Sequence, residues 1–149
     1  MLMHESDLEI GDWLLAEGEE GQGDVPYKVI SLNDRWSMNR DGKCPVTIES
    51  KECWWDVDKE DMGKLLPMPL TDEMLKANGF SYAPDPDCAG FGRWKSSELD
   101  WFCLEKFDDE DFWSFRFMDS IWSLEYVHTF QHLMRVVGQL LIADNLKIQ

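Results

Sequence analysis

Apolar and polar positions alternate over two stretches of the first half of the chain, which is typical of half-buried strands, and a third stretch is expected to be a strand from its β-branched residues. The stretches are 7–18, broken at Gly11-Asp12, then 25–33 and 45–50. Between the last two, Asp41-Gly42 predicts a hairpin turn. We therefore expect a small, strongly bent sheet of SH3-like type in this half, with an irregular meander as the alternative.

The segment 69–80 has the pattern of a short helix with both ends marked. Thr71 is placed as the N-cap, and Asp72 and Glu73 follow it in the first turn, where negative charge is favourable. Asn78-Gly79 supplies a left-handed stop. A helix of about two turns is marginal in water, so tertiary packing must hold it.

Strands are expected again in the second half, at 92–97, 100–107 and 112–118, after a loop over 81–92 that holds two prolines and two glycines. In the third of these strands Trp113, Phe115 and Phe117 share one face. Apolar groups also occur on its other face, which predicts a central strand with a helix on one side.

The last element is expected to be one helix over 123–145. Its core-facing stripe has spacings of three and four residues, Ser123 is a possible cap, and Gly138 is a tolerated weak point. A second face gathers His128, Gln131, His132 and Arg135. The stripe itself consists of Val127, Phe130, Met134, Val137 and Leu141.

Together these elements predict an α+β fold: a small SH3-like N-terminal β lobe, a short helix, and an antiparallel β-meander closed by a C-terminal helix. A chain of 149 residues is the size of one domain. We expect a single domain, 1–149, with possible lobes at 1–68 and 69–149.

The net charge of -16 is concentrated in two stretches, residues 1–24 with -8 and residues 98–125 with -7. The chain has no basic run, which argues against binding to nucleic acid or to an anionic membrane surface. Two interpretations remain: a surface for a basic protein, or solubility alone. The candidate partner-binding acids are Glu17, Glu19, Glu20, Asp108, Asp109, Glu110 and Asp111.

No signal peptide and no apolar run long enough to span a membrane is recognised, so we expect a cytoplasmic protein. The four cysteines contain no CxxC pair and are expected to be free thiols.

Catalytic and metal signatures are weak. His128 and His132 have the helical spacing of zinc proteases, but Thr129 stands where those enzymes have Glu, and no third ligand is evident. The acids at 108–111 lack the ligand spacing of a calcium loop and are read as a solvated turn. We expect no cofactor, no bound metal and no enzyme activity, with a metal-dependent hydrolase as the least favoured reading.

The adjacent Trp54 and Trp55 point to opposite faces if they lie in a strand. Both can be core residues, one in each lobe; alternatively one is exposed and contacts a partner, since Trp is favoured at binding hot spots.

Three segments in order, IGDWL at 10–14, PLTDEMLKANGF at 69–80 and EYVHTFQHLMRVVG at 125–138, give the chain a recognisable pattern. In this pattern it resembles a group of uncharacterised proteins from phages and mobile elements of gut Bacteroidales. The resemblance implies a mobile-element origin and a cytosolic setting, but no reaction. Tyr126, His128 and Gln131 match the group's closing motif, which carries no known role.

We therefore expect a non-enzymatic acidic accessory protein of a mobile element, acting in the cytoplasm of its bacterial host. It would bind, and possibly inhibit, a basic host or phage protein through a negative surface. The alternative is a small-molecule or nucleotide binder whose pocket is walled by Trp54, Trp55, Trp101 or Trp113.

Overall fold

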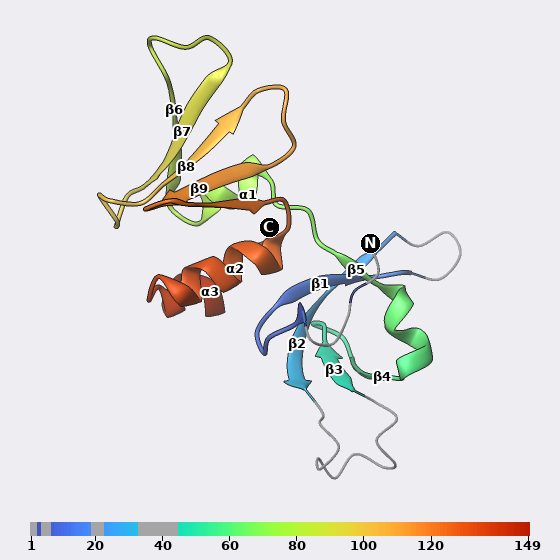
Figure 1. The fold of residues 1–149 in the computed structure, drawn as a ribbon. Helices are drawn as coiled ribbons and strands as arrows, with labels where there is room; N and C mark the ends of the chain where they lie inside the picture. The colour runs from blue at the N-terminus through green and yellow to red at the C-terminus, as the bar shows by residue number, and fades with distance from the viewer. Residues whose placement is uncertain (1–2, 4–6, 19–22, 33–44) are drawn as a thin grey trace. The chain divides into compact units, whose positions relative to one another are not determined.

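The computed structural model describes residue 3 and residues 7–18, 23–32 and 45–149, and it divides the chain into two compact units (Figure 1). Unit 1 is Met1–Met68 and unit 2 is Pro69–Gln149. Each unit holds a five-stranded antiparallel sheet, and short helices accompany the sheets. The α+β class expected from the sequence is thus confirmed.

Unit 1 has the strand order β4-β3-β2-β1-β5, so β1 pairs with both β2 and β5. A short 3₁₀ helix, η3 (Lys59–Lys64), leads into the last strand. The strands are β1 (Trp13–Ala16), β2 (Val25–Leu32), β3 (Val46–Glu49), β4 (Trp54–Val57) and β5 (Leu65–Pro67).

The buried core of unit 1 consists of aliphatic side chains and one methionine. It contains Met3, Leu8, Leu14, Ala16, Val29, Val46, Ile48, Val57 and Leu65. The strand expected over 7–18 is shorter than predicted. Gly11 has a φ of 96°, and the Asp12 carboxylate accepts the Glu9 N–H at 2.8 Å, so the chain turns before β1 begins. The hairpin predicted at Asp41-Gly42 lies outside the described residues.

Unit 2 is a meander in which each strand pairs with the next, in the order β10-β9-β8-β7-β6. Three short helices accompany it: α1 (Asp72–Ala77) precedes the sheet, and α2 (Val127–Val136) and α3 (Leu140–Asp144) follow it. The strands are β6 (Phe80–Pro84), β7 (Phe91–Ser96), β8 (Cys103–Phe107), β9 (Trp113–Phe117) and β10 (Ser120–Leu124).

One face of this sheet, the helix face, carries the core of unit 2. The register places Trp94 beside Leu104 on β7 and β8, and Phe115 beside Trp122 on β9 and β10. Helix α2 packs on this face, since the rings of Phe80 and Phe130 lie 5.7 Å apart edge to face. The central position predicted for 112–118 is therefore correct, because β9 is paired on both sides.

Helix α1 forms as its capping signals predict. The Thr71 hydroxyl accepts the Met74 N–H at 3.2 Å, Leu75 is buried, and Gly79 has a φ of 85° at the stop. The strands predicted at 92–97, 100–107 and 112–118 also form, over β7, β8 and β9.

The end of the chain differs from the single helix expected over 123–145. Ser123 lies in β10 and does not cap a helix; α2 begins at Val127 and ends at Val136. Gly138, with a φ of 81°, breaks the helix instead of being tolerated inside it. His128 and Gln131, expected on a second face, are buried at 3% and 0% exposure.

Strand β6 (Phe80–Pro84) takes up the end of the segment 69–80 that is predicted as a helix and the start of the loop that is predicted over 81–92 from its prolines and glycines. Pairing with β7 explains this, because Phe80, Ser81, Tyr82 and Ala83 form a continuous register with Ser96, Lys95, Trp94 and Arg93. The strand conformation of residues 80–84 therefore depends on pairing with β7, a long-range interaction that local sequence does not reveal.

Candidate functional site

The negative charge of unit 2 lies almost entirely in one segment. Residues 69–149 hold fourteen acids and seven bases, a net charge of -7. Residues 98–125 hold nine of those acids and two of those bases, which also gives -7. The rest of unit 2 is therefore neutral, and its field originates in the segment that contains β8, β9 and β10.

The same segment exposes large apolar side chains. Met118 is 83% exposed, Trp101 and Ile121 are each 58% exposed, and Phe117 is 54% exposed. Single exposed apolar residues are normal on a protein surface, but a group of them marks an interaction site. Phe107 and Trp122 are exposed as well; Phe117 and Trp122 lie on the helix face of the sheet, whereas Ile121 and Phe107 lie on the opposite face.

Several of these side chains surround a shallow apolar cavity of about 420 Å³, which we call the aromatic hollow. Its sheet side continues the core outward: the Phe115 ring is stacked on Phe102 at 4.8 Å and on Phe117 at 6.4 Å. The lining consists of Trp101, Phe115, Phe117 and Trp122, together with Leu133, Val136, Val137 and Gly138 around the end of α2.

Strand β10 forms one edge of the unit 2 sheet, and the aromatic hollow adjoins it through Trp122. The strand has the sequence SIWSL, with no charged residue and no proline, and its first four residues are exposed. Edge strands of natural proteins usually contain a charged residue or a proline, which prevents pairing with other chains, and β10 has neither. Asp119 precedes the strand and Glu125 follows it, so carboxylates flank an uncharged edge.

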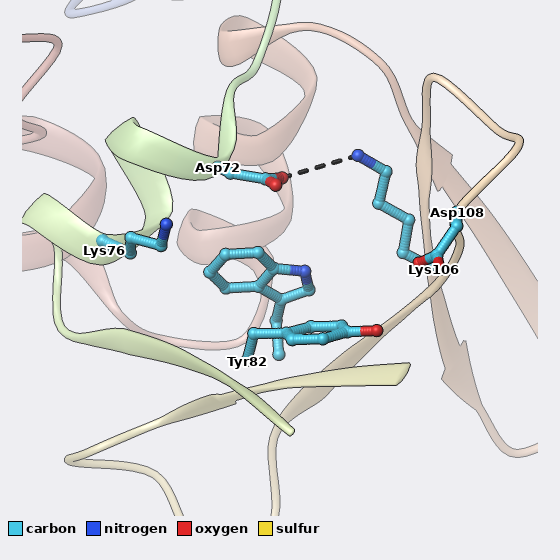
Figure 2. Close-up of a pocket in the computed structure, with 6 residues that line it drawn as sticks. Asp72, Lys76, Tyr82, Lys106 and Asp108 are labelled. Carbon is cyan, nitrogen blue, oxygen red and sulfur yellow. Dashed lines mark hydrogen bonds and ion pairs between the residues drawn. The ribbon is translucent and has the colours of Figure 1, made fainter. Parts of the chain in front are cut away.

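A second cavity, the charged hollow, lies between α1 and the helix face of the sheet and has a volume of about 300 Å³. Figure 2 shows its side chains converging, with Asp72 and Lys76 on α1 and Lys106 and Asp108 across from them. Lys106 Nζ lies 3.4 Å from Asp72 Oδ1 and 4.2 Å from the centre of the Trp113 ring. This ion pair joins α1 to β8.

The Tyr82 ring is part of the same cavity and lies over Gly92, where a Cβ atom would be only 2.2 Å from Tyr82 Cε2. Partial burial and then the Asp108 carboxylate raise the pKa of the Tyr82 hydroxyl. Tyr82 also contacts the Trp94 ring at 5.5 Å.

Two polar groups of the charged hollow lack a hydrogen-bond or ion-pair partner in the described part of the chain. Lys76 Nζ lies 5.9 Å from the Trp94 ring centre, and no carboxylate of the described residues forms an ion pair with it. Trp94 is 2% exposed, and its Nε1–H has no partner among the described atoms. The Lys76 ammonium therefore offers a positive charge in a hollow that is also lined by the carboxylates of Asp72 and Asp108.

The acids selected from the sequence are distributed over both units. Glu17 is exposed just after β1 in unit 1, where its N–H donates to the Lys64 carbonyl at 3.1 Å. Glu19 and Glu20 lie outside the described residues. In unit 2, Asp108, Asp109, Glu110 and Asp111 form the turn between β8 and β9, and Glu110 is the half-buried member.

Of the adjacent tryptophans, one is exposed and the other packs against the core, which is the second of the two arrangements expected from the sequence. Trp54 is 65% exposed on β4, whereas Trp55 packs half-buried against the unit 1 core. Neither lines the described hollows of unit 2, where the tryptophans are Trp94, Trp101 and Trp122.

The three residues of the closing motif occupy structural positions. Gln131 Nε2 donates to the Ala143 carbonyl at 2.8 Å and so fastens α2 to α3. The His128 ring is stacked on Tyr126, with centroids 5.9 Å apart and planes at 12°, and lies 5.8 Å from the His132 ring.

Sequence reasoning missed Phe117, Trp122, Tyr82, Lys76 and Lys106 as site residues. A signal for Trp122 was present in Ser120–Leu124, a short uncharged run with adjacent apolar residues between two acids, and Phe117 ends the strand that the sequence predicts just before it. Tyr82 and Lys106 come together through the register of β6, β7 and β8, and Lys76 joins them from α1; local sequence predicts neither arrangement.

In the described part of the chain, no helix has the length and apolar character needed to cross a bilayer. No family model, no curated protein and no solved structure matches the chain.

Proposed function

We propose that the chain is a non-enzymatic binding protein, and that unit 2 binds a basic protein through the aromatic hollow. The observation that carries this proposal is the coincidence of two features in residues 98–125. This segment holds the whole net charge of unit 2 and supplies the exposed rings of Trp101, Phe117 and Trp122.

The two features have complementary physical effects. Exposed aromatic rings around a preformed hollow are typical of binding hot spots, because they bury large areas with little loss of conformational freedom. A negative field speeds association with a basic partner and makes it depend on salt. Asp100 precedes Trp101, and Asp119 lies two residues after Phe117, so acids flank the rings in sequence.

The broader setting rests on the sequence. We propose a mobile-element origin, action in the bacterial cytoplasm and inhibition of the basic partner, supported by the order of the three motifs and the acidic composition. An SH3-like architecture for unit 1 is likewise a proposal. It is supported by a four-strand meander whose first strand also pairs with β5, and by η3 directly before β5.

Selection from a random-peptide display library on the immobilised chain tests the binding proposal. Selected peptides are expected to combine Lys or Arg with apolar residues, and to lose binding to the variants Phe117→Ser and Trp122→Ser. Trp54→Ser is the matched control, because it removes an exposed Trp from unit 1. Peptides without basic residues, or equal binding to Trp122→Ser, would contradict the proposal.

A second candidate function, a small-ligand binder, is favoured by the charged hollow. Lys76 and Lys106 offer cations beside the exposed Tyr82 ring. These groups suit a small anion that carries a flat ring, such as a nucleotide, since the ring can stack while the anion meets Lys76.

Titration of the tryptophan fluorescence with a nucleotide panel tests this second candidate. A saturable change is expected in the wild type, with a weaker affinity in Lys76→Met. Lys95→Met is the control, because Lys95 is exposed on β7 and does not line the hollow. A flat response from the wild type contradicts the candidate.

A further inference from the structure

Strand β10 has a free side. Its five residues pair in unbroken antiparallel register with β9, from Ser120 opposite Phe117 to Leu124 opposite Trp113. Among the described strands, none pairs with its other side. The opposite edge strand of the sheet, β6, ends at Pro84, which limits pairing there.

One hydrogen bond next to β10 shows which of its main-chain N–H and C=O groups point away from β9. The Leu70 N–H donates to the Glu125 carbonyl at 3.0 Å, and Pro69 bridges Tyr126, so this carbonyl points away from β9. Main-chain groups alternate in direction along a strand. The N–H and C=O groups of Ser123 and Ile121 therefore point to the free side, whereas those of Trp122 point to β9.

The side chains beside this edge differ between the two faces. Trp122 pairs with Phe115 on the helix face and lines the aromatic hollow. Ile121 pairs with Arg116 on the opposite face. A strand added to β10 would thus place every second side chain next to the hollow, and the remaining side chains between the carboxylates of Asp119 and Glu125.

Two partners could pair with this edge: a second copy of the chain, or a basic segment of another protein. Their charges distinguish them. In a two-fold antiparallel pairing of two β10 strands centred on Trp122, the Asp119 end of each strand would lie beside the Glu125 end of the other, although the Glu125 carbonyl itself stays bonded to the Leu70 N–H. Like charges directly opposite destabilise a strand pair, and each unit 2 carries a net charge of -7. A second copy is therefore disfavoured, whereas lysine or arginine side chains would find a carboxylate at either end.

From this geometry we infer that the partner binds by strand addition: an extended segment in which basic and apolar residues alternate joins β10 as a sixth strand. Its main chain pairs with Ile121 and Ser123, its apolar side chains cover the aromatic hollow, and its basic side chains approach Asp119 and Glu125. This inference rests on the proposed function and names its binding mode.

The probe for the test is a short capped peptide in which lysine alternates with valine, together with two N-methylated forms. One form is methylated at the lysine nitrogens and the other at the valine nitrogens. In an added strand only one of these sets donates to β10. One methylated form is therefore expected to lose binding by at least about tenfold, while the other keeps the affinity of the parent peptide.

A variant of the protein gives an independent measurement. Ser123→Pro removes a main-chain donor on the free side without touching the pairing with β9, so the fold should survive, as proline does on edge strands. Peptide affinity should fall by about tenfold, with an unchanged unfolding midpoint. If this variant fails to fold, the methylated peptides decide alone, because they leave the protein unaltered.

The outcomes separate the two levels of the proposal. If the parent peptide binds and Trp122→Ser abolishes binding, but both methylated forms bind alike, strand addition is wrong while the proposed function stands. If the parent peptide does not bind at all, the proposed function itself is contradicted. A dimer of the chain in solution that Ser123→Pro disperses would assign the edge to a second copy and overturn the inference.

Discussion

Phe117 continues the ring stack of Phe115, with centroids 6.4 Å apart and planes within 10°, yet Phe115 is 4% exposed and Phe117 is 54% exposed. The same row of rings thus serves the core at one end and the surface at the other. We expect the two positions to respond in opposite ways to truncation.

Phe115→Ala should lower the free energy of unfolding by about 3–5 kcal/mol, since it removes a buried ring. Phe117→Ser should cost about 1 kcal/mol or less, since its ring is already half in solvent, but it should abolish binding of selected basic peptides. Chemical denaturation and peptide titration measure the two effects. Equal destabilisation by the two changes would show that Phe117 belongs to the core.

Met118 holds the tight turn between β9 and β10 with a φ of 52°, a left-handed conformation unusual for a residue with a side chain. Met118→Gly should therefore raise the free energy of unfolding by about 1 kcal/mol. Met118→Ala, which keeps the strain, is the control and should have little effect. A loss of stability in the glycine variant would contradict this view of the turn.

Gly138 distinguishes the structure from the continuous helix suggested by the sequence. Its φ of 81° ends α2, and a Cβ there would meet nothing within 4 Å. Gly138→Ala should therefore lower stability by about 1–2 kcal/mol through backbone strain alone. Inside a continuous helix the same change would raise stability by up to about 1 kcal/mol, so the sign of the effect is the observation to make.

Asp85 should make unit 2 sensitive to acid. The Asp87 N–H, and then the Arg93 guanidinium, hold the pKa of the Asp85 carboxyl below its usual value. Because the folded pKa is the lower one, the stabilisation is complete above the unfolded value of about 3.9 and is lost as the pH falls through the folded pKa.

Thermal unfolding of the wild type and Asp85→Asn across this range tests the point. The wild type should have the higher midpoint near neutral pH, and the two midpoints should converge in acid. A difference that persists unchanged at low pH would assign the effect to packing rather than to the carboxylate.

Local signals were sufficient for some elements and not for others. Thr71, Leu75 and Gly79 mark α1 directly, because capping and a left-handed stop are properties of a few neighbouring residues. Alternation likewise predicted β9. In contrast, β10 is not predicted: its last two residues fall in the helix expected over 123–145 and its first three in no expected element, since the Met118-Asp119 turn lacks the glycine or asparagine that usually signals a hairpin.

The candidate site was predicted in part. The acidic stretch 98–125 is visible in the sequence, but its association with exposed rings requires the sheet order that puts β10 at an edge. The charged hollow was not predictable, because Lys76, Tyr82 and Lys106 come from separate elements whose pairing is long-range. The first acidic stretch, residues 1–24, belongs to unit 1.

The dissociation constant of the lysine–valine peptide, compared at about 0.05 M and about 0.5 M sodium chloride, tests the central claim most directly. The wild type should bind the peptide at low salt and lose about tenfold or more of its affinity at high salt, and Trp122→Ser should bind at neither. An affinity that is independent of salt, or that survives the loss of Trp122, would contradict the claim that acidic charge and exposed aromatic rings on unit 2 act together as a binding surface.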